Sequence, residues 1–251
     1  MEISDNNSDC YIKLPQRSIL VFGGSFNPVH QGHLELITNL LKLGGDPEIL
    51  VVPAAQSPFK SRQDLLPAEI RWRLLEIALP KNPRLHLLDN EVNRSGLSYS
   101  YETWQQLCEQ YRPENWFWVI GSDTFAEFDR WYRAEEFVKK IQLIVVKRKE
   151  ERVQDVSAFW NPLMRLFPVG QNSMDEKEFW HDGQRIATSL DFDLPAVSSS
   201  EIRKGKFATQ GIVPSTRLIL QSALDDLRVD RERRTKKADA PTPQSDGSKN
   251  H

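Results

Sequence analysis

The chain has 251 residues, a hydrophobic fraction of 39% and a formal net charge of −2 at pH 7. This length allows one large domain or two small ones, and the near-neutral charge gives no overall basic surface for nucleic acid. No stretch is long and apolar enough for a membrane span, the N-terminus lacks signal-peptide features, and two cysteines exclude a disulfide framework. We therefore expect a soluble, cytoplasmic protein with no nucleic-acid or membrane partner.

The first predicted unit is a strand, a glycine turn and a helix. Residues 18–22 are apolar and rich in β-forming residues, Gly23-Gly24 ends this run, and apolar residues recur at helical spacing from about Gln31 to Leu41. The glycines let the main chain approach a ligand, and the new helix directs its first N–H groups into the same space. This turn is therefore suited to a phosphate.

Two histidines lie at the start of that helix. His30 and His33 are three residues apart, so on a first helical turn both rings project to one side as hydrogen-bond donors. Pro28 precedes them and fixes one backbone dihedral of the connection. A metal site at His30-x-x-His33 is a further interpretation, but the other histidines lie in no ligand-spaced cluster with this pair.

Strand and helix patterns alternate further along the chain. Strands are predicted at 48–53, 84–88, 116–120 and 141–146, and helices at 68–79, 98–110 and 134–140, the helix at 98–110 starting at Ser98 or Ser100. This alternation predicts an α/β fold with a parallel sheet and crossover helices on both faces. Ligands of such sheets bind beyond the carboxyl ends of the strands. The loops at 23–24, 53–60, 90–98 and 121–123 should therefore meet at one edge.

The C-terminal third of the chain is less regular. Residues 147–184 begin with a charge run and then mix aromatics with Pro, Gly and Asp, which predicts an irregular insertion. A last strand is expected at 186–192, a short helix after Ser198-Ser199-Ser200, and a final helix over Val213–Leu227. We therefore predict a flexible leader at 1–15, one domain over 16–227 with a small C-terminal helical part, and a disordered basic tail at 228–251.

Two segments resemble the signature of the HxGH nucleotidyltransferases, a superfamily of Rossmann-like enzymes. The first is G-G-S-F-N-P-V-H-Q-G-H at residues 23–33, and the second is S-S-S-E-I-R at 198–203, which is similar to the I-S-S-T-x-I-R motif used on ATP phosphates. The resemblance implies ATP and Mg²⁺ at this site. The implied catalytic residues are His30, His33 and Arg203, and the implied ATP-binding residues here are Gly23, Gly24, Ser25, Phe26, Ser199 and Ser200.

Two further segments resemble the bacterial nicotinate mononucleotide adenylyltransferases. They are L-S-Y-S at 97–100, preceded by Glu91 and Arg94, and I-G-S-D-T-F at 120–125, followed by W-Y at 131–132. The resemblance places Gly121 and Asp123 at the adenosine. It places the mononucleotide substrate against Lys60, Ser98, Tyr99, Ser100, Trp131 and Tyr132.

The implied reaction is attack by the 5′-phosphate of nicotinate mononucleotide on the α-phosphorus of ATP, which gives deamido-NAD and pyrophosphate. No metal bound by the protein itself and no covalent enzyme intermediate is expected. The sequence departs from the family where Ser57-Pro58-Phe59-Lys60 replaces P-P-H-K or P-P-H-R, where Ser100 replaces Thr, and where Lys147-Arg148-Lys149 replaces an Arg-Pro-Gly turn. The first and third departures leave the substrate end less defined than the catalytic end.

Two other functions and the oligomeric state remain open from the sequence. Another acceptor could be used in the same fold, such as nicotinamide mononucleotide, pantetheine phosphate or a CTP-dependent alcohol phosphate, although the segments at 97–100, 120–125 and 131–132 argue against the last two. The chain could also bind nucleotides without turnover, as a sensor. Association into a homo-oligomer is neither predicted nor excluded by the sequence.

Overall fold

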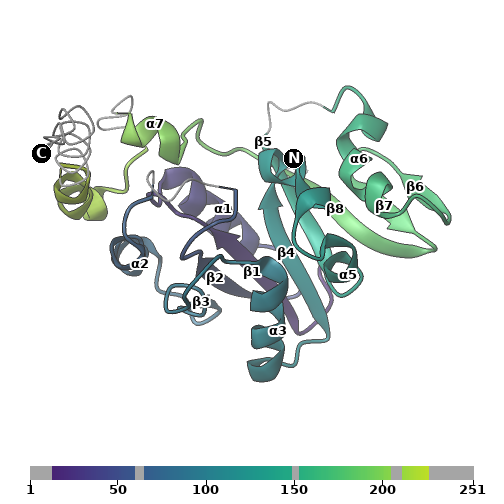
Figure 1. Ribbon diagram of the computed structural model, residues 1–251, viewed down its shortest axis with the longest axis horizontal. Coiled ribbons are helices and arrows are strands. Elements are labelled where there is room, and N and C mark those ends of the chain that lie inside the picture. The colour runs from purple at the N-terminus through teal and green to yellow at the C-terminus, as the bar shows by residue number, and fades with distance from the viewer. Residues whose placement is uncertain (1–12, 60–64, 149–152, 205–210, 226–251) are drawn as a thin grey trace, which may run out of the picture.

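The computed structural model describes residues 13–59, 65–148, 153–204 and 211–225 and builds them around an eight-stranded sheet (Figure 1). The strands are β1 (Ser18–Gly24), β2 (Glu48–Pro53), β3 (Leu85–Leu87), β4 (Asn115–Gly121), β5 (Gln142–Arg148), β6 (Asn172–Met174), β7 (Glu178–His181) and β8 (Gln184–Phe192). Their order in the sheet is β3-β2-β1-β4-β5-β8-β7-β6. Strands β1 to β5 and β8 pair in parallel, which confirms the predicted sheet type.

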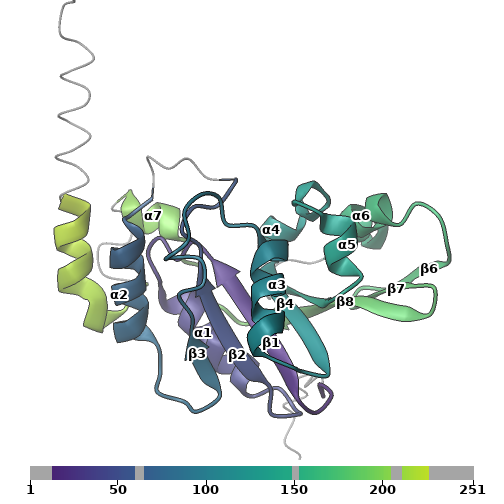
Figure 2. The same cartoon turned by 60° about the horizontal axis from the view of Figure 1, so that its bottom comes forward.

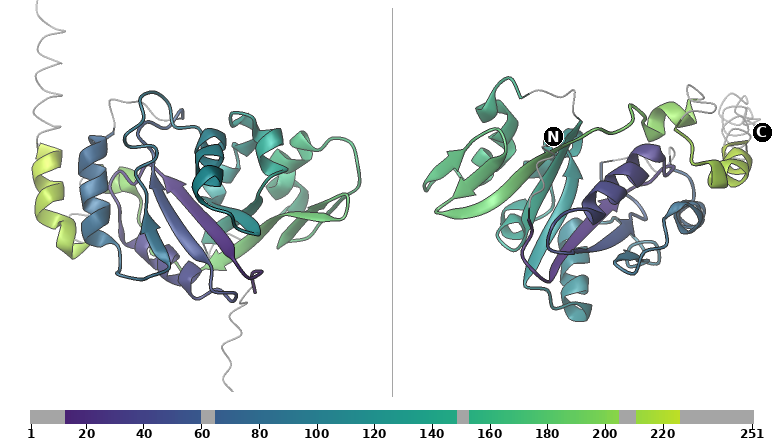
Figure 3. Two further views of the ribbon diagram at one scale, coloured as in Figure 1. Left: turned by 90° about the horizontal axis from the view of Figure 1, so that it is seen from below. Right: turned by 180° about the vertical axis from the view of Figure 1, so that it is seen from behind.

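Helices cover both faces of this sheet. They are α1 (Gln31–Leu41), α2 (Ala68–Ala78), α3 (Ser100–Gln110), α4 (Ser122–Phe125), α5 (Ala134–Val138), α6 (Val156–Leu166) and α7 (Ser199–Arg203), with 3₁₀ turns η2 (Phe128–Arg130) and η3 (Pro214–Thr216). Figures 1 and 3 show α1 on one face and α3 on the other. None of the helices in the described ranges is long and apolar enough to cross a membrane.

The alternation of side chains along the strands divides the core in two. Leu20 and Phe22 of β1 join the apolar cluster of α1, α2 and α7, whereas Ile19 and Val21 join the cluster of α3, α4, α5 and α6. Successive residues of a strand point to opposite faces, so a central strand covered on both sides is apolar throughout. This explains why residues 18–22 read as one continuous apolar run.

The order of the strands reverses between β1 and β4. From β1 the chain moves outward to β2 and β3, and it then returns to place β4 on the other side of β1 and continues to β5 and β8. The two strands are parallel neighbours, so Gly24 and Gly121 end them at the same edge. Such a switch point leaves a crevice beyond the strand ends in which ligands bind.

The C-terminal helical part lies beside α2, at the β3 end of the sheet. Residues 217–225 are helical and follow η3, which contacts α2, and Figure 2 shows this helix alongside α2. The predicted helix over Val213–Leu227 is therefore confirmed up to residue 225, with a first 3₁₀ turn at Pro214. The tail at 228–251 lies outside the described residues.

The leader ends earlier than predicted. Leu14 is buried in the core, and its main-chain N–H donates to the carbonyl oxygen of Gly44 at 2.9 Å. Lys13 forms a parallel bridge with Gly44. The buried Leu14 side chain and the bridge of Lys13 thus attach residues 13–15 to the domain. Contacts of this kind leave no periodic pattern in the sequence, so they could not be predicted from it. Residues 1–12 lie outside the described part.

The described residues of the segment 147–184, which are 147–148 and 153–184, are largely helix and strand, and the prediction of an irregular insertion was wrong there. It contains α6 and the hairpin of β6 and β7, which extends the sheet by two antiparallel strands beside β8. Strand β8 itself starts at Gln184, before the predicted position. Pro162 inside α6 and strands of three and four residues hid the periodicity that a sequence pattern needs.

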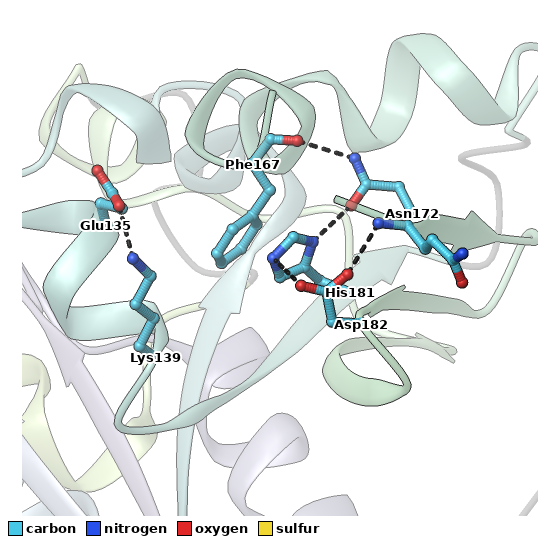
Figure 4. A network of polar contacts seen from close by, with 7 residues as sticks. Glu135, Lys139, Phe167, Asn172, His181 and Asp182 are labelled. Carbon is cyan, nitrogen blue, oxygen red and sulfur yellow. Dashed lines mark hydrogen bonds and ion pairs between the residues drawn. The ribbon is translucent and has the colours of Figure 1, made fainter. Parts of the chain in front are cut away.

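Side-chain contacts fix this hairpin to the end of α6 (Figure 4). The rings of Phe167 and His181 stack with their centroids 4.3 Å apart. Asn172 donates its amide N–H to the Phe167 carbonyl oxygen at 2.9 Å, and its amide oxygen lies 2.9 Å from Nδ1 of His181. The fully buried Trp160 donates its indole N–H to the carbonyl oxygen of Asp175 at 2.7 Å. The insertion therefore packs as an integral part of the sheet.

Candidate active site

Two cavities open at the carboxyl edge of the sheet. The larger one, which we call the His33 cavity, has a volume of about 750 Å³ and is lined by the ends of β1 and β4 and by the starts of α1 and α7. It brings together these sequence-predicted residues: Gly23, Gly24, Ser25, Phe26, His30, His33, Gly121, Asp123, Ser199, Ser200 and Arg203. The two HxGH motif segments, far apart in sequence, thus face one space.

The two histidines lie against each other. Their rings stack with centroids 3.7 Å apart, and the main-chain N–H of His30 donates to Nδ1 of His33 at 3.2 Å. Because Nδ1 of His33 accepts this bond, the proton of its neutral ring is on Nε2. His30 precedes the first turn of α1, yet the two rings lie side by side and both residues line the His33 cavity, as predicted. In this tautomer His33 carries its ring hydrogen on Nε2.

The ring of Phe26 packs beside that of His33. It is buried, its ring centroid lies 5.0 Å from that of His33, and its φ of 43° falls in the left-handed region that residues other than glycine rarely adopt. A strained conformation of this kind is kept where the surrounding structure requires it and is common at functional sites.

Helix α7 is bonded directly to the β1–α1 turn. Ser199 donates its hydroxyl to the carbonyl oxygen of Pro28 at 2.9 Å, and Arg203 donates from Nη1 to the carbonyl oxygen of Asn27 at 2.5 Å. Ser198 caps α7 by accepting from the N–H of Glu201 at 3.2 Å. Ser198 is therefore a helix cap. Ser199 bonds α7 to the β1–α1 turn and so helps to hold the Arg203 guanidinium beside that turn.

The turn after β4 needs a glycine. A Cβ atom on Gly121 would lie 2.6 Å from Oδ1 of Asp123, and this oxygen accepts from the N–H of Thr124 at 2.8 Å. Any larger residue at position 121 would therefore displace the Asp123 carboxylate. Both residues line the His33 cavity, as the sequence predicted.

The second cavity, which we call the Tyr99 cavity, has a volume of about 330 Å³. It collects the sequence-predicted residues Ser98, Tyr99, Ser100, Trp131 and Tyr132. The rings of Tyr99 and Tyr132 lie 4.7 Å apart, which gives an aromatic wall. Lys60 was predicted for this part of the site and lies outside the described residues.

The two cavities meet. Seven residues line both of them, namely Gly23, Gly24, Ser25, Phe59, Asp123, Thr124 and Trp131. Phe59 is 45% exposed, which is unusual for a large apolar side chain at the mouth of a polar site. A ligand in one cavity and a ligand in the other would therefore approach each other over the paired glycines.

Sequence reasoning missed Arg71. This fully buried side chain on α2 donates hydrogen bonds to four carbonyl oxygens, those of Ser25, Ala54, Ala55 and Leu66, at 2.5 to 2.9 Å. Burial lowers the pKa of Arg71 to about 10, against the raising effect of the Glu91 charge. One feature of the sequence could have indicated its burial: Arg71 lies at helical spacing from the apolar Leu74, Leu75 and Ala78, and so on the same face of the predicted helix.

Glu91 belongs to a motif in the sequence, but the motif does not indicate that its side chain lines the site. It is 5% exposed, lines the Tyr99 cavity, and accepts a hydrogen bond from the hydroxyl of Thr103 at 2.5 Å. Burial raises the pKa of Glu91, while hydrogen bonds from Thr103 and Ser98 and the charges of Arg94 and Arg71 oppose that rise. A buried carboxylate with several donors is a costly feature that a polar loop sequence does not reveal.

Ser98 lies just before α3. The helix begins at Ser100, one of the two predicted starts, and Tyr99 before it makes no side-chain cap. The hydroxyl of Ser98 instead accepts from the N–H of Ala55 at 3.0 Å, and its own N–H donates to the carbonyl oxygen of Gln56 at 2.8 Å. Ser98 therefore joins the start of α3 to the loop after β2.

Comparison with known proteins adds the relatives of this site. The chain matches the cytidylyltransferase-like family over residues 21–205. It is 33% identical over 172 residues to a probable nicotinate-nucleotide adenylyltransferase of Aquifex aeolicus, which is 68% of this chain and 97% of that protein. A probable nicotinate-nucleotide adenylyltransferase of Bacteroides thetaiotaomicron is 34% identical over 156 residues, 62% of this chain and 69% of the relative.

A solved structure supports the fold. The Plasmodium falciparum nicotinic acid mononucleotide adenylyltransferase complexed with NaAD aligns over 82% of this chain and 96% of its own, with a TM-score of 0.61 and 19% identity. The Rossmann-like architecture predicted from the sequence is thus confirmed. By its family match and its relatives, the chain belongs to the cytidylyltransferase-like family and, within it, to the nicotinate-nucleotide adenylyltransferases.

Proposed function

We propose that this protein transfers the adenylyl group of ATP to nicotinate mononucleotide, giving deamido-NAD and pyrophosphate in NAD biosynthesis. The observation that carries the proposal is the pair of cavities that share Gly23, Gly24 and Ser25. Two nucleotides seated in them would bring an acceptor phosphate and the α-phosphorus of ATP together over a main chain that carries no side chain at two positions. Positioning of this kind supplies much of the catalysis in phosphoryl and nucleotidyl transfer.

ATP would occupy the His33 cavity. Its phosphates would receive hydrogen bonds from Nε2–H of His33 and from the guanidinium of Arg203, which α7 holds beside the same turn, and would lie at the start of α1. These donors would stabilise the charge that develops on the departing pyrophosphate. The adenosine would lie toward Gly121 and Asp123.

Nicotinate mononucleotide would occupy the Tyr99 cavity. The aromatic wall of Tyr99, Trp131 and Tyr132 suits a planar pyridine ring, and the hydroxyls of Ser98 and Ser100 lie at the start of α3. The 5′-phosphate would attack the α-phosphorus in line, the bond to the β-phosphate oxygen would break, and pyrophosphate would leave. No covalent enzyme intermediate is needed.

Mg²⁺ would enter with ATP. The side chains at the phosphate end of the His33 cavity are mostly donors, which fits an ion held by phosphate oxygens and water, the hard ligands that Mg²⁺ prefers. Within the described ranges, His, Cys, Asp and Glu form no group of three or more arranged for a metal. The ion would neutralise charge on the pyrophosphate. We further propose that the enzyme acts in the cytoplasm, on soluble nucleotides.

Product analysis tests this proposal. The protein would be incubated with ATP, Mg²⁺ and nicotinate mononucleotide, and the products would be separated and identified by mass. We expect deamido-NAD and pyrophosphate in equal amounts and no orthophosphate. Binding of both nucleotides without any product would contradict enzymatic turnover and favour a sensor, whereas orthophosphate in place of pyrophosphate would contradict attack at the α-phosphorus.

A further inference from the structure

Glu91 stands out among the charged residues near the site because the chemistry described above does not use it. It follows β3, is almost completely buried, and lines the Tyr99 cavity but not the His33 cavity. A buried carboxylate is expensive unless its hydrogen bonds are satisfied. Its presence beside a cavity meant for an anionic nucleotide therefore requires an explanation.

The contacts of Glu91 lead to the walls of that cavity. Its carboxylate accepts from the hydroxyl of Thr103, in the first turn of α3, and the hydroxyl of Ser98 further stabilises its charged form. Ser98 in turn accepts from the N–H of Ala55, after β2. Arg71 completes the network, because it binds the carbonyl oxygens of Ala54 and Ala55 and that of Ser25.

This network connects the loops that follow three neighbouring strands. Ser25 follows β1, Ala54 and Ala55 follow β2, and Glu91 and Ser98 follow β3. Most links are hydrogen bonds to a main-chain group or between buried side chains, so they persist only while the loops keep their relative positions. The opposite charges of Arg71 and Glu91 interact across it.

We propose that Glu91 is a positioning residue for the phosphate-acceptor substrate. Its carboxylate holds Ser98 and the first turn of α3 against the loop after β2, and so sets the shape of the Tyr99 cavity. The inference rests on the proposed function in naming nicotinate mononucleotide as that substrate. It predicts that changes to Glu91 affect the acceptor and leave ATP binding unchanged, because Glu91 does not line the His33 cavity.

The test measures KM for each substrate separately, in pyrophosphate release by the full chain. Glu91→Leu should raise the KM for nicotinate mononucleotide about tenfold or more, since a buried hydrogen bond to a charged group is lost, and should change the KM for ATP less than about twofold. Glu91→Gln keeps the shape and one acceptor, so it should recover part of the loss.

Two further variants separate positioning from other roles. Thr103→Val removes one hydrogen bond to Glu91 from a residue that lines neither cavity, and it should still raise the KM for the acceptor severalfold. Asp89→Asn is the matched control. This exposed carboxylate lies in the same loop and, within the part of the chain that the structure describes, its hydrogen-bond partner is Asn93. Both KM values should stay at the parent level.

Charge alone predicts the opposite result. Removing a negative group beside an anionic substrate lowers its KM by electrostatics, so a fall in the acceptor KM of Glu91→Leu would overturn the inference. Equal changes in both KM values, or none in either, would also overturn it.

The shift in unfolding temperature produced by each nucleotide gives a readout that needs no turnover. We expect the shift by nicotinate mononucleotide to shrink in Glu91→Gln and Thr103→Val while the shift by ATP is retained; retention of both shifts would overturn the inference. The parent protein tests the proposed function separately, since a parent stabilised by ATP but not by the mononucleotide would contradict that function first.

Discussion

At the scale of single residues, the tautomer of His33 decides what the site can do. Its Nδ1 accepts the N–H of His30, so the ring hydrogen is on Nε2, the group that would donate to a phosphate in the proposed function. We predict that His33→Ala lowers kcat about 10²-fold or more, as removal of a transition-state donor does. Steady-state pyrophosphate release measures this, with circular dichroism as the control for folding, and a loss of less than about tenfold would contradict the role.

Glu91 gives a residue-scale prediction about pH. Burial raises its pKa above the usual 4.5, so the folded protein keeps a proton on this group at pH values where the unfolded chain has lost it. The stability from that proton is present at low pH and is lost as the pH rises through the raised pKa. Glu91→Gln cannot ionise, so its unfolding temperature relative to the parent should increase between about pH 4 and about pH 7. If the difference in unfolding temperature stayed constant with pH, burial would not raise the pKa of Glu91 and the prediction would be contradicted.

At the scale of elements, the hairpin insertion and the site should be separable. Trp160 on α6 is fully buried, donates to Asp175, and lines neither cavity. Trp160→Phe should cost about 1 to 3 kcal/mol in the free energy of unfolding, because the carbonyl of Asp175 loses its donor and a small void remains around the buried ring. Denaturant titration measures the loss. Altered KM values in the folded variant would instead indicate that the insertion shapes the active site.

Elements with a periodic pattern could be predicted from the sequence, and contacts between distant elements could not. The run at 48–53 was predicted with its observed bounds because a central parallel strand is apolar on both faces. The hairpin of β6 and β7 was missed because its strands are too short to show alternation, and its pairing depends on the edge of β8. Such short strands are defined by their neighbours.

The site shows the same division between motif and contact. The residues of the HxGH segments could be assigned from their order, and they do line one cavity. The hydrogen bond of Ser98 to Ala55 spans 43 positions, and Arg71 reaches carbonyl oxygens on the two loops that follow β1 and β2, so these partners could not be read from local sequence. Local rules left the helix start open between Ser98 and Ser100, and the contact of Ser98 with Ala55 could not be predicted from them.

At the scale of the whole molecule, the reversal of strand order between β1 and β4 creates the site. It places the ends of these strands side by side, and the two cavities open there and share the paired glycines. In the proposed function, one edge of one sheet would therefore receive both substrates. The central claim is that the acceptor is a nicotinate mononucleotide and that it occupies the Tyr99 cavity.

The most direct measurement is pyrophosphate release from ATP and Mg²⁺ with nicotinate mononucleotide and nicotinamide mononucleotide run side by side. We predict a clear preference for the acid in kcat/KM. Equal use, or preference for the amide, would keep the fold and the chemistry and contradict the assigned substrate. Release with neither mononucleotide would contradict the proposed function itself.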